Sequence, residues 1–243
     1  MRYKKDSIQE ALCEMNFIPG GEPWDLTYFG RFFELTKTDY PKRKNQENIE
    51  MSLELGPTGP KHTVTKSPKM LFLASDEKSL IQLSENQLVA NVLRPYPHWD
   101  TFRGKILSVY ANYKKVIPGA TLSNFVLRYI DRWDFEKPGF ELAQFFSLGP
   151  QSKYLPACLA PVGAPCMLRF QTPLGDDLIL DLSFTMPPDE GKAVTALDTR
   201  LIKTKANTDE EEFEKALEVM HKLLTNIYED VVNDHLRTRM EPV

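Results

Sequence analysis

The sequence is poor in cysteine and histidine, which limits the chemistry that it can support. The three cysteines among its 243 residues, Cys13, Cys158 and Cys166, are too few and too far apart for a disulfide framework or for paired CxxC zinc knuckles. We interpret them as reduced thiols. The four histidines do not form the His-Glu-x-x-His pattern of a zinc protease, since His221 is followed by Lys-Leu-Leu. The sequence therefore predicts no metal site and no cofactor.

Motifs for nucleophilic catalysis and for phosphate binding are absent as well. The chain has no GxSxG, no GxxxxGKS/T and no GxGxxG after a predicted strand, which are devices for acyl transfer and for holding phosphate groups. We therefore predict no catalytic residue and expect a protein that is not an enzyme. The N-terminal residues include no apolar run of signal-peptide length, and no later segment is long and apolar enough to span a membrane. We expect a cytoplasmic protein without a membrane partner.

No charge of either sign dominates the sequence. Thirty Lys and Arg residues stand against 34 Asp and Glu residues, so the formal net charge is −4. This balance excludes a global electrostatic attraction to nucleic acid or to an anionic membrane. With 42% hydrophobic and 26% charged residues, the composition is that of an ordinary globular protein that can form a core.

One local region is nevertheless basic. Residues 42–69 have the least regular pattern of the chain, and a group of prolines and glycines at residues 56–60 excludes regular structure there. We interpret the region as a solvated basic loop, because three glutamates dilute its charge. The alternative is that its cationic side chains contact the phosphate groups of a nucleic acid. The candidates for such a contact are Lys42, Arg43, Lys44, Lys61 and Lys66.

The most regular stretch is Leu122–Phe135, which we predict to be a strand at the centre of the fold. Hydrophobic and polar residues alternate along it with a period of two, as in a strand with one buried and one polar side. The exception is Asp131, which the alternation places on the apolar side beside Tyr129 and Trp133. A buried carboxylate needs hydrogen-bond donors or a shifted pKa. Asp131 is therefore either catalytic or, as we favour, a structural acceptor for backbone, Tyr or Trp donors.

Charged residues also lie on predicted strand faces. Asp177 and Asp181 share one face of a strand, where they could hold a metal ion or act as acid and base. We favour a ladder of cross-strand ion pairs as the explanation of the same residues. In this ladder, arginines on neighbouring strands pair with the carboxylates: Arg128, Arg132 and Arg169.

The periodicity of the sequence also places the other elements. We expect helices at residues 26–40, 98–117 and 140–146, and a last helix from a capping box of Thr208 and Glu211 to Val231. We expect further strands with period-2 or β-rich patterns. These strands are at residues 10–18, 49–55, 70–75, 79–84, 87–94, 167–171, 177–186 and 193–203.

The order of elements predicts an α+β fold made of two tandem β-α-β(3-4)-α halves. Residues 10–117 and residues 121–236 each begin with a strand and a helix, continue with antiparallel strands and end with a long helix. An antiparallel curved sheet with helices on one face is an α+β layer fold. We expect residues 1–118 and 119–243 to form two halves that pack as one unit. The layout looks like the TATA-binding-protein-like saddle, with a helix-grip fold as the alternative.

Four segments resemble a family of uncharacterised prokaryotic proteins of about this length: IQEALCEMNF, NQLVANVLRPYPHWDTF, LRYIDR and DHLRTRM. The family is sporadically distributed, carries an LRYIDR-type central strand and has no established activity. The resemblance implies a bacterial protein linked to mobile or defence genes. It implies no functional residues.

Together these observations predict a non-catalytic binding protein, which is an adaptor, inhibitor or accessory subunit for a protein partner. The partner-binding residues would lie on the polar face of the curved sheet: Arg128, Arg132, Arg169 and Asp181. The alternative is a nucleic-acid-binding accessory protein that uses the basic region. A third hypothesis is a metal-dependent hydrolase built on the aspartates described above. Unpaired sheet edges would also permit a homodimer.

Overall fold

The computed structural model describes residues 3–20, 23–56, 59–136, 140–148, 166–187, 191–206 and 208–243, except for the side chains of residues 48–56 and 59–65. The helices are α1 (Thr27–Thr36), α2 (Trp99–Val116), α3 (Leu142–Phe145), α4 (Glu210–Val231) and α5 (Asp234–Met240). The strands are β1 (Ile8–Ile18), β2 (Lys42–Gly56), β3 (Gly59–Leu73), β4 (Ser79–Ser84), β5 (Gln87–Leu93), β6 (Thr121–Glu136), β7 (Cys166–Pro173), β8 (Leu178–Met186) and β9 (Lys192–Lys203).

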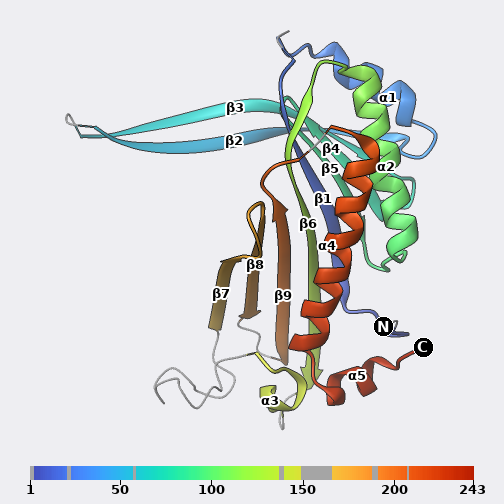
Figure 1. Cartoon of the computed structure of the whole chain (residues 1–243), viewed down its shortest axis with the longest axis vertical. Coiled ribbons are helices and arrows are strands. Elements are labelled where there is room, and N and C mark those ends of the chain that lie inside the picture. Colours follow the sequence, from blue (N-terminus) through green and yellow to red (C-terminus); the bar gives the residue numbers. More distant parts are fainter. Residues whose placement is uncertain are drawn as a thin grey trace.

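All of these strands belong to one antiparallel sheet of nine strands in the order β2-β3-β4-β5-β1-β6-β9-β8-β7. Its centre is the pair β1 and β6, whose ladder runs from Ile8 opposite Asp131 to Ile18 opposite Thr121. The long helices α2 and α4 lie side by side against the sheet (Figure 1). The strand predicted at the centre of the sequence is therefore also central in the sheet.

The predicted fold of two tandem halves, whether as a TATA-binding-protein-like saddle with helices on one face or as a helix-grip fold, is wrong. The part of the chain that the structure describes is mostly a single nine-stranded sheet with five helices. The physical reason is the β1–β6 ladder, which joins the strands on both sides into one hydrogen-bonded sheet. The two predicted halves also differ in their first helices, since α1 has 10 residues and its counterpart α3 has 4.

The basic loop predicted at residues 42–69 is also wrong. This region forms most of a hairpin of β2 and β3, whose register runs from Lys42 opposite Leu73 to Gly56 opposite Gly59. Of the glycines and prolines that indicated a loop, Gly56, Gly59 and Pro60 lie at the ends of β2 and β3 where the hairpin turns, and a ladder tolerates them there. The hairpin extends away from the rest of the sheet, on the side away from α2 (Figure 1).

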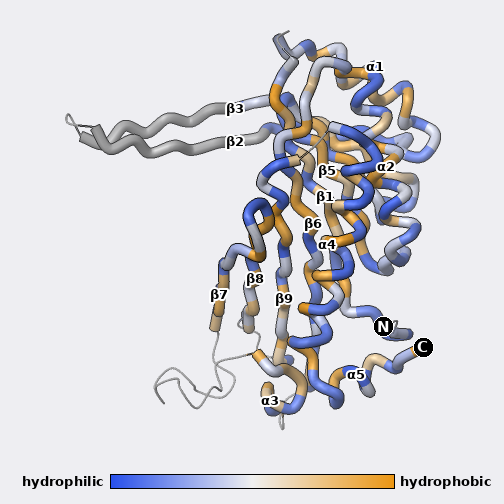
Figure 2. Tube along the Cα trace, in the orientation of Figure 1, coloured by the Kyte–Doolittle hydropathy of each residue, from blue (hydrophilic) through white to orange (hydrophobic). Residues whose placement is uncertain are grey.

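The core forms where the apolar sides of the central strands meet the helices. Alternate residues of β1 and aromatic residues of α2 are buried there, including Met15, Phe17, Tyr110 and Tyr113. Figure 2 shows hydrophobic residues along β1, β6, α2 and α4. A second cluster around Trp133 packs under α3 and α5. The predicted strand at 122–135 and the helix at 98–117 are therefore confirmed, and both bury the predicted sides.

The last predicted helix is confirmed with its end at Val231, but its cap differs from the prediction. Asp209, in place of Thr208, has the extended backbone of an N-cap, and its side chain accepts a hydrogen bond from the backbone N–H of Glu212 at 3.0 Å. The capping motif is thus shifted by one residue. Beyond Val231 the chain becomes extended at Val232 before α5 begins.

This cap can be tested by stability measurements. Replacing Asp209 with alanine leaves the N–H of Glu212 without its side-chain acceptor, and should lower the free energy of unfolding by about 1 kcal/mol in chemical denaturation. Thr208→Ala is the matched control, because only the backbone carbonyl of Thr208 receives hydrogen bonds. A larger loss from Thr208→Ala than from Asp209→Ala would restore the original assignment.

Candidate functional site

The polar side of the sheet is organised around one row of residues that crosses the strands. We call the side of β1, β5, β6, β7, β8 and β9 that faces away from α2 and α4 the open face, and Figure 1 shows no helix over it among the described residues. The register of neighbouring strands places one residue of each directly opposite the next. From β7 to β5 the row is Gln171, Asp181, Arg200, Arg128, Leu12 and Asn91.

Two arginines are direct neighbours in this row. Arg128 and Arg200 lie opposite each other on β6 and β9, and like charges in that position repel. Asp198 resolves the conflict, because it accepts hydrogen bonds from Arg128 at 2.8 and 2.7 Å and from Arg200 at 3.3 and 2.9 Å. Burial raises the pKa of Asp198, but these hydrogen bonds outweigh burial and hold the pKa below its usual range. One carboxylate therefore fixes two guanidinium groups.

A second ion pair lies next to this group. Arg169 on β7 donates two hydrogen bonds to Asp181 on β8, at 2.9 and 2.7 Å. The hydrogen bonds from Arg169 lower the pKa of Asp181, whose side chain is buried. Three of the four predicted partner-binding residues thus belong to neighbouring ion pairs. The fourth, Arg132, instead pairs with Asp134 on its own strand at 3.0 Å.

The two aspartates predicted as a possible metal or acid–base pair have separate partners. Asp177 pairs with Lys203, whereas Asp181 pairs with Arg169. Within the described part of the chain, no group of three or more His, Cys, Asp or Glu residues could hold a metal ion. The arrangement agrees with the ladder of cross-strand ion pairs that we favoured.

The basic residues at 42–69 do not form one patch. Lys42 donates to the carbonyl of Ser75 at 2.8 Å and pairs with Glu77 at 2.7 Å, and Lys66 pairs with Glu47 at 2.9 Å. The guanidinium of Arg43 lies 4.2 Å from the centre of the Phe33 ring. Lys44 is exposed, and the side chain of Lys61 is outside the described residues. Three of the five candidate phosphate contacts are therefore already engaged.

The other candidate site is a cavity of ≈ 780 Å³ on the helix side of the sheet. Residues far apart in the sequence build it: the N-terminal segment before β1, the residues preceding α2, the strand β6 and the helix α4. At its wall lies Asp131, the residue that interrupts the alternation of β6. Asp131 is only 2% exposed.

Asp131 is held by a side chain that the sequence did not indicate. Its Oδ1 accepts a hydrogen bond of 2.7 Å from the hydroxyl of Ser7, and that hydroxyl lies 2.9 Å from the hydroxyl of Tyr228. No hydrogen bond from a described residue reaches Oδ2. Burial raises the pKa of Asp131 to about 7, and the hydrogen bond from Ser7 opposes this only in part. Asp131 therefore accepts a hydrogen bond, as predicted, but its donor is a serine hydroxyl and not the predicted backbone, Tyr or Trp group.

The wall opposite Ser7 consists of aromatic residues linked by polar atoms. The hydroxyl of Tyr129 lies 2.9 Å from Nδ1 of His221 and 3.3 Å from the hydroxyl of Tyr96. The His221 ring stacks on Trp99 with ring centres 4.1 Å apart, and burial lowers the pKa of His221. Sequence analysis missed this group, because the same residues also fit an ordinary apolar helix or strand face.

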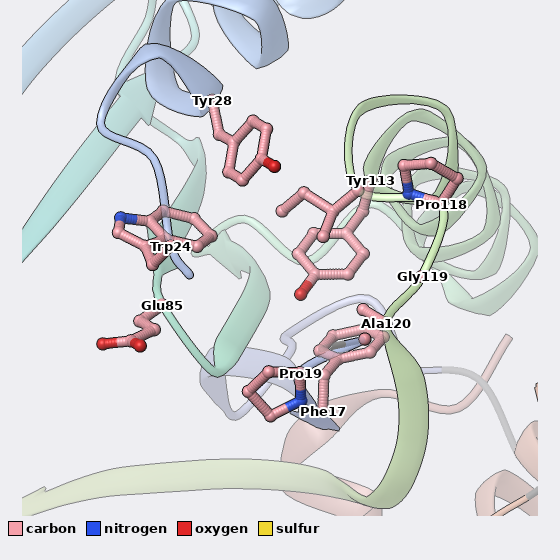
Figure 3. Close-up of a pocket in the computed structure, with 11 residues that line it drawn as sticks. Phe17, Pro19, Trp24, Tyr28, Glu85, Tyr113, Pro118, Gly119 and Ala120 are labelled. Carbon is pink, nitrogen blue, oxygen red and sulfur yellow. The ribbon is translucent and has the colours of Figure 1, made fainter. Parts of the chain in front are cut away.

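A smaller pocket of ≈ 210 Å³ lies at the other end of the sheet. Figure 3 shows the rings of Trp24, Tyr28 and Tyr113 around it, with Pro19 and Pro118 at its edges. Its only ionisable acid is the exposed Glu85. The larger cavity is therefore the one that combines space with a buried ionisable group.

Comparisons with family models, with curated proteins and with solved structures found no match to this chain. The resemblance to a prokaryotic family therefore stays a prediction. Among the described helices, none is both long and apolar enough to cross a membrane.

The shared carboxylate on the open face predicts a stability effect. Replacing Asp198 with asparagine leaves Arg128 and Arg200 opposite each other without their common counter-charge. We expect the free energy of unfolding to fall by roughly 2 kcal/mol in urea denaturation, less than for a fully buried pair because the site is partly exposed. Asp134→Asn, which removes an exposed pair with Arg132, should change it by less than about 0.5 kcal/mol. Equal losses of unfolding free energy in the two variants would show that the carboxylate shared by Arg128 and Arg200 stabilises the fold no more than an exposed pair does.

The raised pKa of Asp131 predicts that the free energy of unfolding depends on pH differently in the wild type and in a variant without this carboxyl group. As pH rises from about 4 to about 7, the unfolded carboxyl group ionises while the folded one stays protonated, so the wild type loses stability. The shift from 3.8 to about 7 corresponds to on the order of 4 kcal/mol. Asp131→Asn lacks this loss, so the variant should gain stability relative to the wild type over this range. Denaturation curves at several pH values check this, and a constant difference would contradict it.

Proposed function

We propose that this chain is a non-catalytic binding protein, an adaptor, inhibitor or accessory subunit that holds a protein partner against the open face of its sheet. The observation that carries the proposal is the group of paired charges on β7, β8, β9 and β6, on a face that no described helix covers. Arginines and carboxylates whose positions are already set lose little conformational entropy when a partner docks.

Apolar residues lie beside the charges on the same face. The register places Ile179, Ile202 and Val126 opposite one another on β8, β9 and β6, and all three are partly exposed. Protein interfaces combine an apolar centre with polar groups that set specificity. A protein partner with complementary charges fits such a mixed surface.

The charge balance of the open face favours protein over nucleic acid. Arg128, Arg169 and Arg200 each have a carboxylate partner on this face. Nonspecific affinity for nucleic acid comes from cations that are free to neutralise phosphates. The three arginines are not free in this sense, because carboxylates already neutralise them. The net charge of −4 adds no general attraction.

A nucleic-acid-binding function is the second candidate, and the β2–β3 hairpin is the observation in its favour. Residues 42–73 contain six Lys and Arg against three Glu, and Figure 1 shows the hairpin extending beyond the body of the sheet. A two-stranded ribbon can enter a DNA groove. Steeply salt-dependent retardation of DNA or RNA would support this alternative. The hydrolase hypothesis gains no comparable support from the described residues.

The thiols agree with a cytoplasmic location, which forms part of the proposal. Cys13 and Cys166 are both free, and Cys13 is fully buried, where burial raises its pKa. Free thiols are ordinary in a reducing compartment. Cys158 lies outside the described residues.

A charge reversal on the open face tests the proposal. Arg132 is exposed and lies on the open face of β6, so Arg132→Glu should leave folding intact and weaken partner binding at least tenfold through like-charge contacts. The measurement is quantitative recovery of companions from the native host by tagged protein at low salt. Lys222→Glu, at an exposed position on α4, makes the same charge change elsewhere and should not affect recovery. A companion recovered equally by both variants, or no companion of the wild type, would overturn the proposal.

A further inference from the structure

We propose that the cavity around Asp131 binds a protonated organic amine through its alkylammonium group. The occupant is either a small free amine or the lysine side chain of a bound peptide, since both present the same chemistry. This site lies on the helix side of the sheet, so it is independent of the open face. Three features of the cavity carry the inference.

The first feature is a buried carboxylate with one free oxygen. Ser7 occupies Oδ1 of Asp131, while Oδ2 receives no hydrogen bond from the described residues. No Lys or Arg among those residues forms an ion pair with Asp131. An isolated buried carboxylate is unfavourable unless a counter-charge or a proton neutralises it. A bound ammonium group would supply both the missing charge and hydrogen-bond donors for Oδ2.

The second feature is the overall charge of the lining. Asp6 contributes another carboxylate, which accepts hydrogen bonds from the backbone N–H groups of Ile8 at 3.0 Å and Tyr96 at 3.3 Å. Among the described residues of the wall, Lys4 is the one Lys or Arg, and its side chain is 65% exposed. Burial lowers the pKa of His221 and so favours its neutral form. The cavity therefore attracts cations and repels anions.

The third feature is the aromatic content of the wall. Five tyrosine and tryptophan side chains line it: Tyr3, Tyr96, Trp99, Tyr129 and Tyr228. Aromatic rings attract alkylammonium ions through their π systems, and the attraction is stronger where the contact is desolvated. Hydrogen bonds and ring stacking hold Trp99 and Tyr129 against His221, so this part of the wall is already formed.

The size of the cavity agrees with such a ligand. Its volume of ≈ 780 Å³ lies within the range of about 300–1,000 Å³ that is usual for small-molecule sites. A carboxylate at the wall and rings around it are the two elements by which proteins recognise amines.

Calorimetry with charged and neutral probes of equal shape tests the proposal. At a pH of about 8.5, where Asp131 is ionised and primary amines are still protonated, 5-aminopentan-1-ol is compared with hexan-1-ol, in which a methyl group replaces the ammonium group. Nα-acetyl-lysine methylamide is compared in the same way with its 2-aminoheptanoic acid analogue. At least one cation should bind with at least tenfold preference over its neutral counterpart. Binding of 5-aminopentan-1-ol at least as tight as that of the lysine probe identifies a free amine as the ligand, whereas tighter binding of the lysine probe identifies a peptide side chain. Equal affinity for neutral probes, or no binding up to about 10 mM, overturns the proposal.

Matched variants connect the binding to the cavity. Asp131→Asn should weaken binding of the preferred cation at least tenfold, whereas Asp134→Asn, on the opposite face of the same strand, should leave it unchanged. Trp99→Leu provides a second loss of affinity that does not depend on how Asp131→Asn folds. Arg132→Glu should not affect amine binding, so failure of this site and failure of the open face are distinguishable. Unchanged affinity in both Asp131→Asn and Trp99→Leu would refute the assignment.

Discussion

The antiparallel ladder between β1 and β6 is the interaction on which the rest of the structure depends. It joins the four strands β2 to β5 to the three strands β7 to β9. Because this ladder is continuous over most of both strands, the two long helices that follow β5 and β9 face one shared core. Separating β1 from β6 would divide the sheet, expose the apolar sides of both strands and remove the surface on which α2 and α4 meet.

The same ladder produces both candidate sites, one on each side. On the open face, it aligns Leu12 with Arg128 and so extends the row of β7, β8 and β9 to β5. On the helix side, it brings the start of β1 beside the second half of β6, where Ser7 reaches Asp131. The strand β6 thus has two chemical roles in alternate positions, because successive side chains point to opposite sides of a sheet.

The two sites use charge in different ways. On the open face every arginine of the row has a carboxylate partner, so the surface is rigid and nearly balanced in charge. In the cavity, by contrast, Asp131 has a hydroxyl donor but no cation. Paired charges set specificity at an interface with a macromolecule, whereas an unpaired buried carboxylate provides binding energy for a small cation. One chain can therefore combine a docking surface with a ligand site.

Local patterns in the sequence were enough to place most elements. Strand alternation at 122–135 and the helical spacing of aromatic residues at 98–117 depend only on nearby residues, and the structure has both. The alternation also identified Asp131 as a buried acid, since a polar residue in an apolar position is visible without any partner. The strand predicted at 49–55 lies within β2, but its pairing with β3 was missed, because glycine and proline propensities mark a turn without showing that the residues on both sides of it pair.

The sequence by itself thus determined where helices and strands lie and which side of each is buried, because hydrophobic periodicity is a local property. Only the tertiary structure decided which strands pair, and hence that one sheet replaces two halves. It also decided that Ser7 bonds to Asp131 across 124 positions of the chain, and that Arg128 and Arg200 share Asp198. These contacts depend on strand register and chain crossing, which no local pattern specifies.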